Sequence, residues 1–403
     1  MTAPRPPAPP LLPPPAGHVV VALDSFKGSL SARQATAALA RGLRRRGLDV
    51  HEHPVADGGE GTVDALLAAG FAAVPVMATD PLGRPVEVRY ASRDGVAVVE
   101  LAEASGLGLV ADVPATPDRA AAASTLGTGR VVAAALDAGN RTIVVGLGGS
   151  ATTDGGTGLL AGLGARLLDA HGTVLDLTTS PLRSVHSIDR TGLHPRLGEV
   201  ELVVACDVDN PLLGPHGAAA VYGPQKGADA TLVAALDAAL ARWADILSPA
   251  AASLPGAGAA GGAGYALLAL GARVRRGIDL VLELTGLADR LPGARLVVTG
   301  EGRLDHQTLR GKAPAGVAAA ARATGTTTIA ATGHCTLDRA DLAAAGFADA
   351  FALTDLEPDV SHCLTHAEPL LERLGEHIAA AFPPNDIPHA HPSTSITRRA
   401  DHA

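Results

Sequence analysis

The chain has 403 residues and 47% of them are hydrophobic, which is long enough for two domains and apolar enough to fill a large core. Only 2% of the residues are aromatic, and the formal net charge is −9 at pH 7. Binding to nucleic acid requires a basic surface and, for single strands, aromatic side chains on which bases stack. The composition therefore excludes nucleic acid as an expected partner.

The two ends of the chain lack the patterns of folded elements. Residues 1–17 are rich in proline and contain no apolar core of a signal peptide, and residues 383–403 are polar without periodicity. We expect both to be disordered tails. No apolar run is long enough to span a membrane, so no membrane partner is predicted. Cys206, Cys335 and Cys363 suggest no disulfide framework, which favours a reducing, cytoplasmic location.

The first predicted elements form a strand–helix–strand unit. "HVVVALD" (18–24) is a β-like run, a helix is expected over residues 29–47, and "LDVHEHPVAD" (48–57) is the second strand. Ser31 with Gln34 three residues later predicts a capping box at the start of the helix. Such a unit implies parallel strands with a right-handed crossover. Residues 294–302, 313–325 and 326–333 repeat the same plan near the other end.

The middle of the chain has a different order of predicted strands and helices. Residues 84–106 predict a hairpin that turns at Arg93, Asp94 and Gly95. A helix over 128–138, strands over 141–146 and 201–207, and an amphipathic helix over 231–247 follow. We predict an α/β protein of two domains, one formed by residues 18–75 and 291–382 and the other inserted as residues 76–290. Open sheets of this kind hold their sites at the carboxyl ends of the strands.

Five loops share one design, in which glycines and polar side chains follow a predicted strand. They are "LDSFKGSLS" (23–31), "VADGGEGT" (55–62), "GLGGSATTDGGTG" (146–158), "CDVDNPLLG" (206–214) and "TGEGRLDHQTLRGKAP" (299–314). Glycines allow backbone N–H groups to approach an anion closely. Carboxylates in the same loops suit a Mg²⁺ ion held between them and phosphate oxygens. One Asp-Gly-Gly loop alone is a common turn, but five after strands indicate a site for phosphates, a metal and a substrate hydroxyl.

Two other functions stay open on the residues alone. The chain has no P-loop and no protein-kinase signature. "GLGGSA" (146–151) fits the loose dinucleotide pattern G-x-G-x-x-A, so an NAD-linked 2-hydroxy-acid oxidoreductase is an alternative, although 47 glycines make chance matches common. The other alternative is a non-catalytic sensor of a small acid. Carboxylates in all five loops argue against a sensor, because a protein that only binds a small acid needs no set of metal ligands.

Seven blocks of the sequence closely resemble the bacterial glycerate kinase family, the type that phosphorylates D-glycerate with ATP. They are "LDSFKGSLSA", "VADGGEGTVDAL", "GLGGSATTDGG", "ACDVDNPLLG", "AVYGPQKGA", "GAAGGAGYA" and "TGEGRLDHQTLRGKAP", in family order between about residues 18 and 375. The resemblance implies a flavodoxin-like, doubly wound parallel sheet that holds both termini, and an inserted domain described as restriction-endonuclease-like. It also implies ATP and Mg²⁺ as cofactors, with 2-phosphoglycerate as the favoured product. Assembly into a homo-oligomer is left open.

The loops and the resemblance together give the predicted site. The residues predicted to be catalytic are Asp24, Lys27, Asp57 and Arg303. Those predicted to bind substrate or phosphate are Ser25, Gly58, Gly59, Gly148, Gly149, Ser150, Thr308 and Lys312. The predicted metal ligands are Asp207, Asp209 and Glu301. Asp24 or Asp57 would orient or deprotonate the acceptor hydroxyl, and the cations would neutralise the transferring phosphoryl group or hold the substrate carboxylate.

Overall fold

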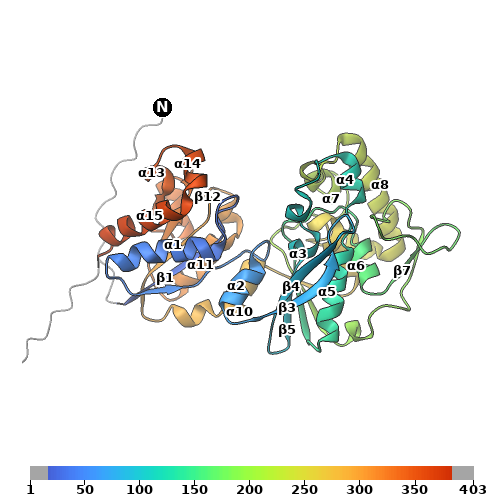
Figure 1. Ribbon diagram of the computed structural model, residues 1–403, viewed down its shortest axis with the longest axis horizontal. Coiled ribbons are helices and arrows are strands. Elements are labelled where there is room, and N and C mark those ends of the chain that lie inside the picture. Colours follow the sequence, from blue (N-terminus) through green and yellow to red (C-terminus); the bar gives the residue numbers. More distant parts are fainter. Residues whose placement is uncertain (1–16, 384–403) are drawn as a thin grey trace, which may run out of the picture.

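The computed structural model describes residues 17–383, so the predicted tails lie outside the described residues except for Gly17 and Pro383. Figure 1 shows two lobes, each built around one sheet, with two short helices between them. The first lobe contains residues 17–57 and 286–383, and the second lobe contains residues 70–275. The helices between them are α2 (Thr62–Ala68) and α10 (Gly277–Thr285). The α/β class predicted from the sequence is confirmed.

The sheet of the first lobe has five parallel strands in the order β15-β13-β11-β1-β2. Their bounds are β1 His18–Leu23, β2 Val50–Glu52, β11 Ala294–Gly300, β13 Thr328–Thr332 and β15 Ala350–Ala352. Counted within this sheet alone, the order is 2-1-3-4-5, which is one of the two common doubly wound orders. This lobe also contains β12 Arg303–Leu304, β14 His334–Cys335, α12 Arg339–Ala345, α13 Leu353–Leu356 and α14 Val360–Thr365.

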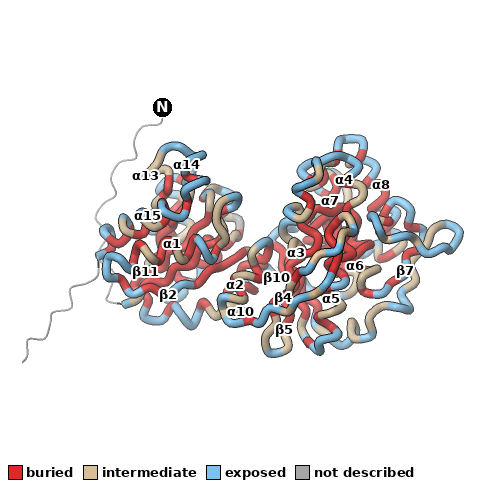
Figure 2. Tube along the Cα trace, in the orientation of Figure 1, coloured by how far each residue is buried: buried red, intermediate tan, exposed pale blue. Residues whose placement is uncertain are grey.

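Helices cover both faces of this sheet because successive strand residues point to opposite sides. Val19 and Val21 of β1 pack with α1 (Ala32–Arg45) and α15 (Ala367–Ala381). Val20 and Ala22 face the other way and pack with α10 and α11 (Ala313–Ala323). Ser31 caps α1 and forms the predicted capping box with Gln34. Figure 2 shows the resulting buried centre of each lobe.

The sheet of the second lobe has six strands in the order β10-β9-β6-β5-β4-β3, of which β5, β6, β9 and β10 are parallel. Their bounds are β3 Ala72–Thr79, β4 Pro85–Arg93, β5 Val96–Glu100, β6 Thr142–Gly146, β9 Glu201–Ala205 and β10 Arg273–Arg275. The predicted hairpin is confirmed as β4 and β5, with Asp94 and Gly95 at positive φ in the turn. No helix in residues 17–383 is both long enough and apolar enough to cross a membrane.

The other elements of the second lobe pack around this sheet. They are α3 Leu101–Ser105, α4 Pro117–Ala122, α5 Leu126–Asp137, α6 Thr157–Gly162, β7 Arg166–Leu168, β8 Ser187–Asp189, α7 Ala218–Tyr222, α8 Ala230–Leu247 and α9 Ala263–Ala269. The predicted boundary between residues 75 and 76 falls inside β3. Helix α2, placed by the prediction with the first sheet, buries Val63 and Leu66 against the second. Helix α10 contacts both sheets, through Ile278 on the first and Leu280 on the second.

Glycines bring the two connections between the lobes, and the loop after β6, into direct backbone contact. A Cβ atom added to Gly277 would lie 2.0 Å from the carbonyl oxygen of Asp57, and one added to Gly58 would lie 2.6 Å from Cα of Gly277. A Cβ atom added to Gly148 would likewise lie 2.4 Å from Cα of Gly59. Distances this short are incompatible with any side chain. The joint between the lobes therefore requires glycine at these positions.

We expect Gly277→Ala to lower the free energy of unfolding by about 1–3 kcal/mol, the usual cost of an overpacked site. Its methyl group would meet the Asp57 carbonyl oxygen and push the two loops apart. Chemical denaturation of both proteins measures the difference. Gly198→Ala is the matched control, because a Cβ atom there would have no neighbour within 4 Å. Equal stability of the Gly277→Ala variant and the unaltered chain would show that the joint yields easily.

Candidate active site

Three predicted acidic residues converge at the carboxyl edge of the first sheet. Asp24 follows β1, Asp57 comes after β2, and Glu301 follows β11. Asp24 is 5% exposed, and its burial, followed by the negative charges of Asp57 and Glu301, raises the pKa of its carboxyl group to about 8. The backbone N–H of Ser25 donates to Asp24 Oδ1 at 2.6 Å and partly offsets this rise. The three residues thus follow neighbouring parallel strands, at the edge of the sheet where the sequence predicts a site, and their roles stay predictions.

Asp207 extends this cluster from the second lobe. It follows β9, and its Oδ1 accepts a hydrogen bond from the backbone N–H of Gly277 at 3.0 Å. Desolvation of the carboxylate, and then the charge of Asp57, raise the pKa of Asp207 to about 6. Asp209 is exposed, and it interacts electrostatically with Cys206 and Tyr222 of the same lobe. Among residues 17–383 no three His, Cys, Asp or Glu side chains are grouped so that they alone could hold a metal ion.

Glu301 has its own partners at the start of α11. Thr308 Oγ1 donates to Glu301 Oε1 at 2.7 Å, and Lys312 Nζ lies 3.7 Å from Glu301 Oε2. Burial raises the pKa of Glu301, while Thr308 and Lys312 act in the opposite direction. Lys312 immediately precedes α11, whose first turn has no side-chain cap. Arg303 is exposed and lies 3.3 Å from Asp305, between their Nε and Oδ2 atoms.

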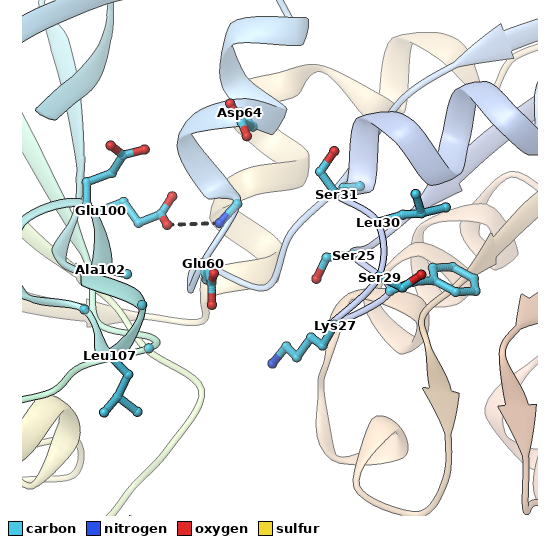
Figure 3. A pocket seen from close by; sticks show the side chains of 18 of the residues that line it. Ser25, Lys27, Ser29, Leu30, Ser31, Glu60, Asp64, Glu100, Ala102 and Leu107 are labelled. Atoms are coloured by element: carbon cyan, nitrogen blue, oxygen red, sulfur yellow. Dashed lines mark hydrogen bonds between the residues drawn. The ribbon is translucent and has the colours of Figure 1, made fainter. Parts of the chain in front are cut away.

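Two cavities meet at the loop of residues 25–29. The first, of about 620 Å³, lies between this loop, Glu60 at the start of the connection to the second lobe, and second-lobe residues such as Glu100 and Leu107, and we call it the interlobe cavity. The second, of about 670 Å³, is lined by first-lobe residues that include Arg303 and Lys312, and we call it the first-lobe cavity. Ser25, Phe26, Lys27 and Ser29 line both cavities. Figure 3 shows Lys27 extending from this loop toward the side of the interlobe cavity that Glu60 forms.

The glycines predicted to bind phosphate lie at the joint between the lobes. Packing alone accounts for the lack of a side chain at Gly58 and Gly148, whereas Gly59 is the backbone that Gly148 contacts. Gly149 differs from them because it lines the interlobe cavity. Ser150 receives a 2.9 Å hydrogen bond from Nζ of Lys226. A role of these residues in phosphate binding stays a prediction.

Two buried ionisable residues near the site were missed by the sequence analysis. Glu100 ends β5, and its Oε1 accepts a 3.0 Å bond from the backbone N–H of Gly61, while its Oε2 accepts one of 3.0 Å from the backbone N–H of Val63. Burial raises the pKa of Glu100 to about 7. Lys226 is 2% exposed, and burial lowers its pKa to about 7. A charge directly after the apolar run of β5, and a lysine inside "GPQKGA", were the available signals.

A model of the glycerate kinase family matches residues 19–383. The chain belongs to the glycerate kinase family. It is 43% identical over 374 residues to a glycerate kinase of Bacillus subtilis (strain 168), which covers 90% of this chain and 97% of that protein. It is also 43% identical over 314 residues to the glycerate 2-kinase of Escherichia coli (strain K12), covering 75% and 82%.

The fold agrees with this membership in the glycerate kinase family. A crystal structure of a protein from Salmonella typhimurium LT2, assigned as glycerate kinase 2, matches with a TM-score of 0.75 and 40% identity. The match covers 91% of this chain and 98% of that one. Family membership confirms the resemblance seen in the seven sequence blocks, and with it the prediction of an ATP-dependent kinase.

We expect Asp24→Asn to stabilise the protein at high pH. Because the folded-state pKa of Asp24 lies above its ordinary value of 3.8, the folded state binds a proton that the unfolded chain releases. The folded protein therefore loses stability as pH rises from about 4 to about 8, by about 1.4 kcal/mol for each pH unit over which the difference is one full proton. The asparagine variant should lack this loss, so its advantage should be largest at pH 8 and vanish near pH 4.

Thermal unfolding across this pH range, in a chelator and without nucleotide, measures the effect. Asp245→Asn, at an exposed position of α8, is the control and should leave the pH dependence of stability unchanged. An Asp24→Asn variant no more stable than the unaltered chain at pH 8 would contradict the assignment.

Proposed function

We propose that the protein transfers the γ-phosphate of ATP to D-glycerate and forms 2-phosphoglycerate and ADP. The observation that carries this proposal is the meeting of two cavities at one short loop, beside the buried Asp24 and the neighbouring Asp57 and Glu301. A kinase that transfers a phosphoryl group between two substrates needs two binding spaces that open onto the point of transfer. The charged groups at that point are those expected for phosphoryl transfer, in which catalysis consists mainly of positioning and charge stabilisation.

The two aspartates suit different tasks. Asp24 keeps its proton near neutral pH in the protein without ligands, because its pKa is raised to about 8. We therefore assign Asp57 to accept the proton of the glycerate hydroxyl and Asp24 to orient the reacting groups. Lys27 lines both cavities and so can neutralise charge on the phosphoryl group as it passes from one substrate to the other.

The residues present fit a Mg²⁺ ion that arrives with the nucleotide. Mg²⁺ usually keeps several waters and takes only one or two carboxylates together with phosphate oxygens, so a site of three protein ligands is unnecessary. Asp24 and Glu301 are buried carboxyl groups whose pKa values are raised first by desolvation and also by the negative charge of Asp57, so a cation would favour their ionised forms. When bound, the ion would neutralise charge on the phosphates. Asp207 could support it from the second lobe, whereas Asp209 is exposed and interacts with Cys206 and Tyr222.

The fold of the first lobe and the product of the reaction can be inferred in more detail. We infer that the first lobe is a flavodoxin-like domain on the strength of its 2-1-3-4-5 strand order. The division into two domains, the restriction-endonuclease-like character of the second lobe, the cytoplasmic location and a homo-oligomer stay predictions. Formation of the 2-phosphate is supported by the similarity to the glycerate 2-kinase of Escherichia coli.

The alternative of an NAD-linked oxidoreductase is disfavoured by packing. In "GLGGSA", Gly148 is pressed against the backbone of Gly59, and a Cβ atom added to Gly146 would lie 2.3 Å from the carbonyl oxygen of Gly58. The close contacts between the lobes already explain why these positions are glycine, so the pattern does not require a bound dinucleotide. The non-catalytic sensor is disfavoured by the cluster of repelling carboxyl groups, which an acidic ligand alone would not require.

Phosphorus NMR of a reaction containing the protein, ATP, Mg²⁺ and D-glycerate tests the proposed function. The expected result is a monoester resonance of 2-phosphoglycerate that grows together with ADP. A resonance of 3-phosphoglycerate would overturn only the position of transfer. Absence of any phosphoglycerate would overturn the proposed substrate.

We expect Asp57→Asn to lower kcat by at least about 100-fold, the low end for loss of a positioned acid or base. The fold should survive, because Asp57 Oδ1 accepts the N–H of Gly59 at 3.1 Å and an asparagine oxygen can do the same. Steady-state kinetics and thermal unfolding are the two measurements. A fall in kcat of less than about tenfold, or about 1.4 kcal/mol of barrier, would make Asp57 a turn residue.

A further inference from the structure

The two cavities differ in charge. The interlobe cavity has four carboxyl groups on its wall, from Glu60, Asp64, Glu100 and Glu103, and one ammonium group, from Lys27. Arg89 pairs with Asp64 at 2.7 Å and lies 3.4 Å from Glu103, so it compensates part of this negative charge. The first-lobe cavity has three cations, Lys27, Arg303 and Lys312, against Glu301 and Asp305. A triphosphate, with its several negative charges, is therefore favoured in the first-lobe cavity.

The lining of the first-lobe cavity also contains apolar side chains, which we call its apolar wall. Val360 and Leu364 of α14 line it and are 53% and 50% exposed, among the most exposed large apolar side chains in residues 17–383. Leu353 and Ala367, both buried, lie on the same wall. Because these two side chains are four residues apart on one helix, they offer a small apolar surface that a ligand in the cavity could cover.

The apolar wall is attached to the loop shared by the two cavities. The hydroxyl group of Ser29 donates to the backbone carbonyl of Leu364 at 2.6 Å. Phe26 and Leu30 of the same segment pair across an antiparallel bridge, and Phe26 is buried. A ligand in the first-lobe cavity can therefore contact both α14 and the loop that carries Lys27.

We propose that the first-lobe cavity is the nucleotide site, with the adenine base against Val360 and Leu364 and the triphosphate directed toward Lys312, Arg303 and Lys27. The proposal rests on the proposed use of ATP and adds the location and the residues that contact the base. An aromatic base needs a flat apolar surface, and a drug-sized ligand fits a cavity of several hundred Å³. The volume of about 670 Å³ is within that range. The γ-phosphate then lies at the loop that opens onto the interlobe cavity.

The test is the affinity for ATP of the full chain carrying Leu364→Glu, measured by calorimetry with Mg²⁺ and without glycerate. The carboxylate would remove the apolar contact with the base, while the backbone carbonyl that accepts from Ser29 is retained. We expect Kd for ATP to rise at least tenfold, and KM for glycerate to change by less than about twofold. Tenfold in Kd corresponds to about 1.4 kcal/mol.

Two variants with the same substitution serve as controls. Leu254→Glu, at a residue that is 43% exposed and outside the linings of both cavities, should leave the Kd for ATP unchanged. Leu107→Glu, in the interlobe cavity, tests the opposite placement. If Leu107→Glu weakens ATP binding and Leu364→Glu does not, the nucleotide occupies the interlobe cavity and the inference is wrong.

The outcome also separates this inference from the proposed function. If the unaltered chain phosphorylates glycerate and Leu364→Glu binds ATP normally, only the location of the nucleotide is refuted. If the unaltered chain binds ATP but phosphorylates no glycerate, the proposed substrate fails while the comparison of variants still locates the nucleotide. Thermal unfolding of each variant identifies any loss of binding that comes from misfolding.

Discussion

The arrangement of the whole molecule depends on backbone contacts between glycines in the connections that join the two lobes and in the loop after β6. Gly58 packs against Gly277, and Gly59 packs against Gly148, at distances that leave no room for a Cβ atom. The same loop carries Asp57, so fixing the joint also fixes the carboxylate that lies between Asp24 of one lobe and Asp207 of the other. A small shift at the joint would therefore change both the angle between the lobes and the spacing of the acidic groups.

The acidic groups gathered at this joint oppose the stability of the protein without ligands. The pKa values of Asp24, Asp207 and Glu301 are all raised, first because the groups are desolvated and then because they repel one another. Lys27 and Lys312 offset only part of this repulsion at Glu301. An arrangement that is unfavourable alone becomes favourable when a cation is added, since opposite charge restores the ionised forms. This is the electrostatic behaviour expected of a site that receives a metal–nucleotide complex.

The helices, the strands and the sheet edge that carries the acidic residues could be predicted from the sequence. The role of each residue at that edge could not. Alternating strands and helices, together with the rule that parallel strands end at one edge, place Asp24, Asp57 and Glu301 together. A glycine-rich loop, in contrast, looks the same in the sequence whether its glycines make room for a phosphate or for a neighbouring backbone segment. Gly58 and Gly148 therefore could not be distinguished from Gly149 before the lobes were seen in contact. Glu100 and Lys226 were missed because their burial comes from tertiary packing alone.

The loop of residues 25–29 connects the joint to the two cavities. One end is fixed by Asp24, whose backbone N–H bonds to the carbonyl of Gly300, and the other by the capped start of α1 at Ser31. The buried ring of Phe26 and the bond from Ser29 to Leu364 hold the middle of the loop. Held at so many points, the loop can support Lys27 between two spaces without a large entropic cost on binding. Lys27 lines both cavities and belongs to the loop that they share. We therefore infer that the phosphoryl group passes from the nucleotide to its acceptor beside Lys27.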